Sequence, residues 1–215
     1  MIKAISGLIL GVVVMSGCSG GQAAAPSATP APLDAARLRA ALLPTPQGMT
    51  VSYGPETGAY GSLKATKQGL DALRTAKVDK PGCAGLGQLD PAKLGTAPAA
   101  VVAYSSKQGS ITQAIVVTGA FPGPIPARCA SYKADVDGTK VTYRTDAVDM
   151  PKRGDQSRAF LTTATSRGSS AQIGAVMIAR KGVVTSLLVL GKEVKKDGLA
   201  ELGRLADEKL ARITA

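Results

Sequence analysis

Few side chains in this sequence are capable of chemistry beyond packing. The 215 residues include three cysteines, fifteen aspartates and glutamates together, and no histidine. The absence of histidine excludes Ser-His-Asp and Cys-His nucleophiles and most catalytic zinc sites. A Ser-x-x-Lys motif, the signature of serine acyltransferases, is also missing. Catalysis would therefore have to rest on carboxylates alone.

The candidate carboxylates form two close pairs and one isolated residue. Asp135 and Asp137 lie two residues apart, Asp146 and Asp149 lie three apart, and Asp155 belongs to Gly154-Asp155-Gln156-Ser157. Neither pair is flanked by aromatic residues, and each position is typical of a turn or a cap. We expect Asp155 to form an Asx-turn that begins the following strand. The sequence therefore predicts no catalytic residue, no cofactor and no metal site, and a protein that is not an enzyme.

The first cysteine lies in a pattern typical of a lipoprotein export signal. Lys3 is followed by the short apolar run Ala4–Val14 and by Met15-Ser16-Gly17-Cys18, with small residues just before the cysteine. This apolar run has the length of a signal-peptide core and is too short for a comfortable membrane span. We predict that residues 1–17 are a signal peptide and that Cys18 is acylated. An ordinary signal peptide with an incidental cysteine is the alternative.

The segment that follows has the composition of a tether. Residues 18–33 carry no charge and are rich in Pro, Ala, Gly and Ser, so they cannot bury enough surface to offset the entropy of ordering. We expect one globular domain over residues 34–215. Its remaining cysteines, Cys83 and Cys129, make an even number in an exported chain, which favours a disulfide. Two separate buried thiols are the alternative.

The charge of the chain suggests its partners. The formal net charge is +11, which favours anionic envelope polymers or lipids, although such a surface is often simply solvated. Arg153, Arg158 and Arg180 are the candidate ligand-binding residues. The lipid anchor makes the membrane a partner. The sequence has no tryptophan, only two phenylalanines and no recognisable nucleic-acid-binding motif. Nucleic acid is therefore not expected as a partner. Nothing in the pattern indicates an oligomeric state.

The periodicity of the domain predicts an α+β fold. Helices are expected over Asp34–Leu43, Ser62–Val78 and a leucine-striped C-terminal segment, with Asp34 and Asp197 as N-caps. A short strand candidate covers Met49–Tyr53, before a glycine-rich loop over Gly54–Gly61, and a short helix is expected to carry Cys129 and Tyr132. About five to six strands are expected in the rest of the domain, over residues 99–105, 111–118, 140–145, 159–165, 173–180 and 183–190.

Short connections between these strands require antiparallel pairing. The first two form a predicted hairpin and the last three a predicted meander. Helices gathered in the N-terminal third and at the C-terminus are expected to cover one face of this sheet.

Several short motifs are distributed along the domain. They are Leu42-Leu43-Pro44 with Gly48, Cys83 and Cys129 around a hairpin, Gly154-Asp155-Gln156-Ser157, Arg180-Lys181-Gly182 and the leucine-striped final helix. Together they resemble a group of actinobacterial envelope lipoproteins similar to the extracellular sensor domain of PknH-type kinases. The resemblance implies an α+β domain with a cleft for an envelope ligand and no catalytic residues. PknH-type domains have two disulfides, whereas only one can form here. Lipoproteins resembling LpqN, with a PsbP-like sheet, and lipid-carrying half-barrels are neighbouring alternatives.

These observations favour a non-catalytic ligand-binding or sensor-type module. Its ligand is expected in a groove between the sheet and its covering helices. A carrier of an apolar envelope lipid is the second hypothesis, and it requires a cavity of roughly several hundred Å³ or more. The small residues of Ile173–Leu190 favour a packed core over such a cavity, and an enzyme ranks last.

Overall fold

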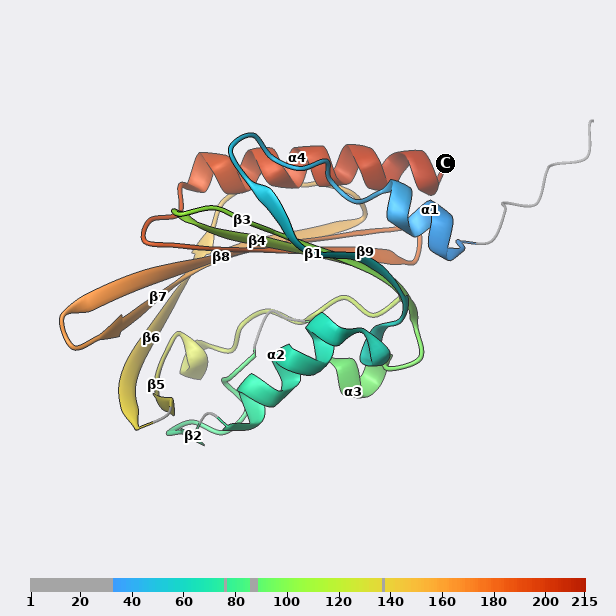
Figure 1. The fold of residues 1–215 in the computed structure, drawn as a ribbon. Helices are drawn as coiled ribbons and strands as arrows, with labels where there is room; N and C mark the ends of the chain where they lie inside the picture. Colours follow the sequence, from blue (N-terminus) through green and yellow to red (C-terminus); the bar gives the residue numbers. More distant parts are fainter. Residues whose placement is uncertain (1–32, 76, 86–88, 137) are drawn as a thin grey trace, which may run out of the picture. The chain divides into compact units, whose positions relative to one another are not determined.

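One antiparallel sheet organises the chain in the computed structural model, which describes residues 33–215 except 76, 86–88 and 137 (Figure 1). The predicted signal peptide, Cys18 and the tether up to residue 32 lie outside the described residues. The elements in chain order are α1 (Ala35–Ala40), β1 (Thr50–Ala59), η1 (Tyr60–Ser62), α2 (Lys64–Thr75), β2 (Lys77–Val78), α3 (Pro91–Leu94), β3 (Pro98–Ser105), β4 (Gly109–Val117), η2 (Ala127–Cys129), β5 (Ser131–Val136), β6 (Thr139–Val148), β7 (Gln156–Ser166), β8 (Ser169–Arg180), β9 (Val183–Gly191) and α4 (Lys196–Ile213).

The sheet has nine strands in the order β1-β3-β4-β9-β8-β7-β6-β5-β2, and every neighbouring pair is antiparallel. The α+β class, the β3–β4 hairpin and the β7–β8–β9 meander are confirmed. The strand number is higher than predicted. β1 continues through the predicted loop, with register shifts near Tyr53, β5 replaces part of the predicted short helix, and β2 ends the predicted Ser62–Val78 helix. In each case pairing with a neighbouring strand outweighs local composition.

One face of the sheet packs against α1 and α4. Asp34 caps α1 as predicted, because its Oδ1 accepts a hydrogen bond from the Arg37 N–H at 2.9 Å. Helix α4 buries one stripe against β8 and β9, made of Leu199, Gly203, Ala206, Leu210 and Ile213. Asp197 is not its N-cap: Lys195 takes that position without a side-chain hydrogen bond, and Asp197 lies in the first turn. A carboxylate there still interacts favourably with the helix dipole.

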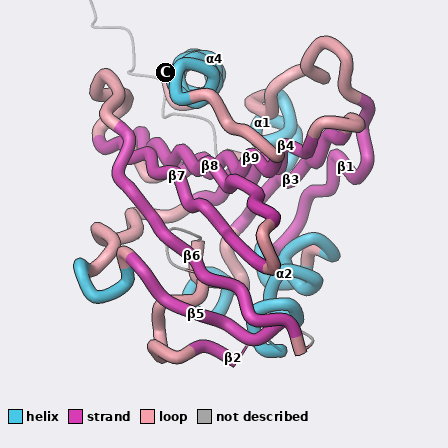
Figure 2. The backbone as a smooth tube through the Cα atoms, turned by 90° about the vertical axis from the view of Figure 1, so that its left-hand side faces the viewer, coloured by secondary structure: helices cyan, strands magenta, loops and turns pink. Residues whose placement is uncertain are grey.

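The opposite face is concave and carries α2, η1 and α3. Figure 2 shows the strands β6, β5 and β2 turning away from the row of β1 to β7, toward the side on which α2 lies. The expectation that all helices cover one face is therefore wrong. Strong twist and coiling allow a long antiparallel sheet to curl in this way, so α2 meets a face that the sequence pattern assigned to no helix.

A disulfide joins the segment after β2 to η2. Cys83 and Cys129 are bonded, with their Cα atoms 5.3 Å apart, which lies within the usual range for this crosslink. Both side chains are buried. In the described part of the chain, no helix is both long and apolar enough to cross a membrane.

Candidate functional site

A cavity of about 540 Å³ lies between the concave face of the sheet and α2. Its floor consists mostly of small side chains, Val101 and Ala103 on β3, Thr112 and Ala114 on β4, and Ser186 on β9. Strand alternation places these residues on one face. Because such side chains reach only a short distance above the backbone, they leave space below the helix.

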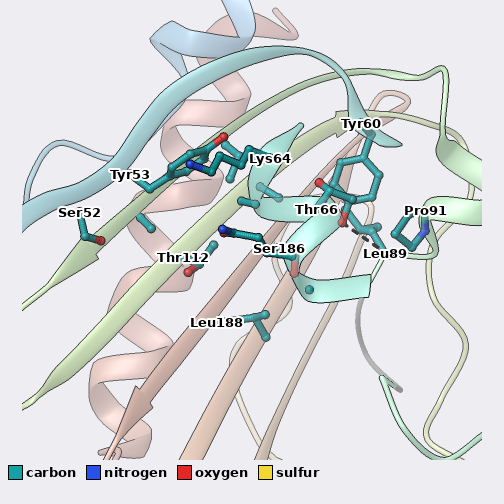
Figure 3. A pocket seen from close by; sticks show the side chains of 16 residues that line it. Ser52, Tyr53, Tyr60, Lys64, Thr66, Leu89, Pro91, Thr112, Ser186 and Leu188 are labelled. Carbon is teal, nitrogen blue, oxygen red and sulfur yellow. Dashed lines mark hydrogen bonds between the residues drawn. The ribbon is translucent and has the colours of Figure 1, made fainter. Parts of the chain in front are cut away.

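The strand register aligns the floor in two rows. Ala103 pairs with Thr112, which pairs with Leu188, and Val101 pairs with Ala114, which pairs with Ser186. Each row therefore mixes hydroxyl-bearing and apolar side chains across neighbouring strands, as Figure 3 shows for Thr112, Ser186 and Leu188. Bulky residues of the same strands, such as Tyr104 and Leu187, face the opposite core beneath α1 and α4.

Helix α2 forms the roof of the cavity, and two backbone contacts hold its start in place. The Lys64 N–H donates to Glu56 Oε2 on β1 at 3.1 Å, so a carboxylate caps the helix. Just before the helix, the Gly61 N–H donates to the Gly95 carbonyl at 2.9 Å, at the end of α3. A Cβ on Gly61 would lie 2.9 Å from the Gly95 Cα, so this close approach requires glycine.

Several polar groups that line the cavity have no hydrogen-bonding partner among the described residues. They include two hydroxyls from opposite walls, Thr66 on α2 and Ser186 on β9, whose residues are 9% and 6% exposed. The side chains of Thr112 and Gln68 and the Lys64 ammonium group also lack a hydrogen-bonding or ionic partner among the described residues. Buried residues normally find partners for their polar groups, so the hydroxyls of Thr66 and Ser186 are available to water or to a ligand.

Tyr60 closes one side of the cavity. Its hydroxyl donates a long hydrogen bond, 3.5 Å, to the Leu89 carbonyl, and both residues line the cavity. Burial, with a smaller contribution from the charge of Asp90, raises the pKa of Tyr60 to about 12. The phenol therefore remains neutral and able to donate at any physiological pH. Tyr53 lines the same cavity, so two of the seven aromatic residues in the chain are found here.

None of the three predicted arginines lines this cavity. Arg180 forms an ion pair with Asp207 of α4 at 2.8 Å. Arg158 donates to the Pro122 carbonyl, and its guanidinium carbon lies 5.5 Å from the centre of the Phe121 ring. Arg153 has its Nε buried without a partner among the described residues. Two of these guanidinium groups thus hold parts of the protein itself together.

Of the candidate aspartates that the structure describes, none lines the cavity, and three have structural contacts. Asp135 accepts from the Gly138 N–H at 2.8 Å within a turn, and Asp146 lies 3.6 Å from Arg144. Asp155 accepts from the Lys181 N–H at 2.7 Å, in the β8–β9 turn rather than in its own turn. It therefore joins two loops, and the expected local Asx-turn is not the contact found.

Asp137, of the first predicted pair, lies outside the described residues, and Asp149 follows β6 on the surface. Across the described ranges, no group of three or more acidic, Cys or His residues is placed to hold a metal ion.

Sequence reasoning did not single out any residue of the cavity. The signal available was the small-residue alternation Val101-x-Ala103 and Thr112-x-Ala114. It identifies one face of a hairpin, but a packed helix–sheet interface has the same pattern. The expectation of a packed core in Ile173–Leu190 holds for the face beneath α4. On the other face, Ser186 and Leu188 border the cavity.

Comparison with known proteins relates the chain to solved structures only. No protein-family model matches the sequence, and no curated protein matches it. The structure is similar to the extracellular domain of PknH from Mycobacterium tuberculosis, with a TM-score of 0.56 and 16% identity over 86% of this chain and 98% of that one. It is also similar to an uncharacterised Mycobacterium smegmatis protein, the Rv0999 ortholog, with a TM-score of 0.50 and 13% identity over 84% of this chain and 95% of that one. The predicted resemblance is confirmed for the fold, which this chain shares with the PknH extracellular domain.

Proposed function

We propose that this protein is a non-catalytic, ligand-binding or sensor-type module of the cell envelope, and that its ligand binds between α2 and the concave face of the sheet. The observation that carries the proposal is the cavity of about 540 Å³, a volume within the range of small-molecule sites. Its lining combines apolar side chains with polar ones, several of which have no partner in the described chain. This composition is typical of binding sites.

The chemistry of the lining supports binding rather than catalysis. Among the described residues that border the cavity there is no carboxylate, thiol or imidazole, and Lys64 is the single charged residue. Tyr60 has a pKa of about 12, so it holds its proton too tightly to act as a base near neutral pH. The described lining therefore offers none of the carboxylate, thiol or imidazole groups on which most general acid–base and nucleophilic catalysis depends.

Three observations support a location outside the cytoplasm. The fold is shared with a domain described as extracellular, the disulfide is typical of oxidising compartments, and the first eighteen residues have the pattern of a lipoprotein signal. On this proposal Cys18 carries the lipid, and residues 18–33 hold the domain away from the membrane.

A carrier of an apolar lipid is the second candidate, and the volume of the cavity is the observation that favours it. Against it stand the hydroxyls of Thr66 and Ser186, two buried residues whose side chains line the cavity without a partner in the described chain. An apolar chain would cover them without replacing their hydrogen bonds to water, which costs about 1–3 kcal/mol for each group.

The test is to obstruct the cavity from the helix. Gly69 of α2 is exposed and borders the cavity, and a Cβ added there meets no atom within 4 Å. Gly69→Phe should therefore narrow the cavity without disturbing the fold, and Gly69→Ala is the matched control that only raises helix propensity. Wild type and Gly69→Ala, expressed in an actinobacterial host, should co-purify with a small molecule detected by native mass spectrometry, and Gly69→Phe should lose it.

Circular dichroism of the three proteins checks that the fold is intact. The proposal is wrong if the folded Gly69→Phe protein retains the same molecule as wild type. It is also wrong if no small molecule co-purifies with the wild-type protein.

A further inference from the structure

The two nearly buried hydroxyls of the cavity lie on opposite walls. Thr66 belongs to the helix and Ser186 to the sheet, their residues are 9% and 6% exposed, and neither hydroxyl has a partner in the described chain. A hydroxyl both donates and accepts hydrogen bonds. Any occupant of the space between the two walls must therefore satisfy both kinds of interaction on two sides, or leave these groups desolvated and unpaired.

The rest of the cavity lining also combines polar and apolar side chains. On the floor, Thr112 pairs across the strands with Ala103 on one side and Leu188 on the other, so a hydroxyl stands between two apolar groups. At the edges, the two tyrosines Tyr53 and Tyr60 contribute aromatic rings, each with a phenolic hydroxyl. Figure 3 shows these groups distributed around the cavity instead of being gathered at one end.

The charges near the cavity do not select strongly for an ion. Lys64 is the one charged residue in the described lining, but its own N–H binds Glu56, whose carboxylate therefore lies at the same end of α2. Asp90 lies between the lining residues Leu89 and Pro91, and it pairs with Lys93 at 3.8 Å. Each carboxylate near the cavity thus has a cation near it, and the polar character of the site comes mainly from neutral groups.

We infer that the ligand of this cavity is a saccharide of about one or two sugar rings, an assignment that rests on the proposed function. A sugar presents hydroxyls that donate and accept in several directions, together with C–H faces that pack on small apolar side chains and aromatic rings. That pattern matches a lining in which Thr66, Thr112 and Ser186 alternate with Ala103, Ala114 and Leu188. An acyl chain matches only the apolar half of it.

The assignment is tested by removing the hydroxyls while keeping the shape of the site. Thr66→Val and Ser186→Ala each delete one hydroxyl, and each should weaken saccharide binding about 3- to 10-fold, the loss of one hydrogen bond. Thr142→Val is the matched control, because Thr142 is an exposed strand residue that does not border the cavity. The Thr142→Val protein should bind the saccharide as tightly as wild type does.

The probes are glucose, mannose, galactose, N-acetylglucosamine and maltose, each titrated to millimolar concentration, with palmitate as the apolar probe. The readout is the shift of NMR signals from Thr66, Ala114 and Ser186. At least one saccharide should shift these signals in wild type, with weaker binding in Thr66→Val and Ser186→Ala. Palmitate should not bind.

Three results overturn the assignment: no saccharide shifts the cavity signals, a saccharide binds equally well to all variants, or palmitate binds and binds more tightly when a hydroxyl is removed. The last result leaves the cavity as a binding site and changes only the ligand class. Failure of the proposed function itself is recognised separately, by a folded Gly69→Phe protein that retains the envelope molecule of wild type.

Discussion

Tyr60 couples the cavity to the alkaline stability of the protein. The residue is 8% exposed, packs with Leu63 and Leu89 in one buried cluster, and its hydroxyl reaches the Leu89 carbonyl. Burial first, and the charge of Asp90 second, raise the pKa of this phenol from 10.0 to about 12. The folded protein therefore holds the Tyr60 proton more tightly than the unfolded chain does.

This difference in pKa predicts how stability depends on pH. The stabilisation linked to Tyr60 is fully present below pH 10 and is lost as the pH rises toward 12, by about 2–3 kcal/mol in all. Tyr104 and Tyr132 also have raised pKa values through burial, so the contribution of Tyr60 is isolated by comparison with Tyr60→Phe. Urea unfolding across this range should show a steeper loss for wild type, and parallel curves would contradict the prediction.

At the scale of elements, the contact between α4 and the sheet depends on glycine in β8. A Cβ on Gly174 would lie 2.6 Å from Leu199 Cδ2 and 2.8 Å from Val194 Cγ1. Both neighbours are buried core residues, so they have little freedom to move aside. The absence of a side chain at this position lets the helix approach the strand closely.

Gly174→Ala should therefore destabilise the protein, by about 1–3 kcal/mol, which is the typical effect of overpacking a core. Gly198→Ala, in the first turn of α4, is the control: its Cβ would meet only Lys195 Cβ at 3.9 Å. Because alanine has the higher helix propensity, this variant should be more stable by about 0.5–1 kcal/mol. Equal unfolding midpoints for the two variants would show that this contact does not limit the approach of the helix.

For the whole molecule, the three cysteines divide into one proposed anchor, Cys18, and one crosslink. Cys83 and Cys129 close a loop with a sequence separation of 46 residues, a constraint worth about 4 kcal/mol in the chain-entropy description. The crosslink ties the segment between β2 and α3, which supplies Leu89 to the cavity, to η2, just before β5. Cys18 lies outside the described residues, and its proposed role concerns the membrane alone.

If these roles are separate, changing the anchor should leave the domain intact. We expect Cys18→Ala to abolish incorporation of labelled fatty acid, while free-thiol labelling of the denatured, unreduced protein still detects neither Cys83 nor Cys129. The reason is that the lipid is attached through the Cys18 thiol, whereas the crosslink depends on the fold and on an oxidising compartment. Unchanged acylation of the variant would remove the basis for the lipoprotein proposal.

Local sequence was a good guide to the elements whose stability is local. The Asp34 cap, the β3–β4 hairpin and the meander ending in β9 all lie where turn residues and alternation predict them. It failed for the second half of β1 and for β2 and β5. Those segments contain glycine, proline or only a few residues, and they become strands because a neighbouring strand pairs with their backbone.

The sequence by itself determined the α+β class, the one disulfide pairing available to its domain and the absence of histidine chemistry, because each follows from residue types and local periodicity. Only the tertiary structure decided the site. Alternation shows that Val101 and Ala103 share a face, but it does not show what that face meets. The curl of the sheet and the position of α2 left space above these small side chains. Curvature and helix placement arise from contacts between distant segments, and single-strand patterns do not encode them.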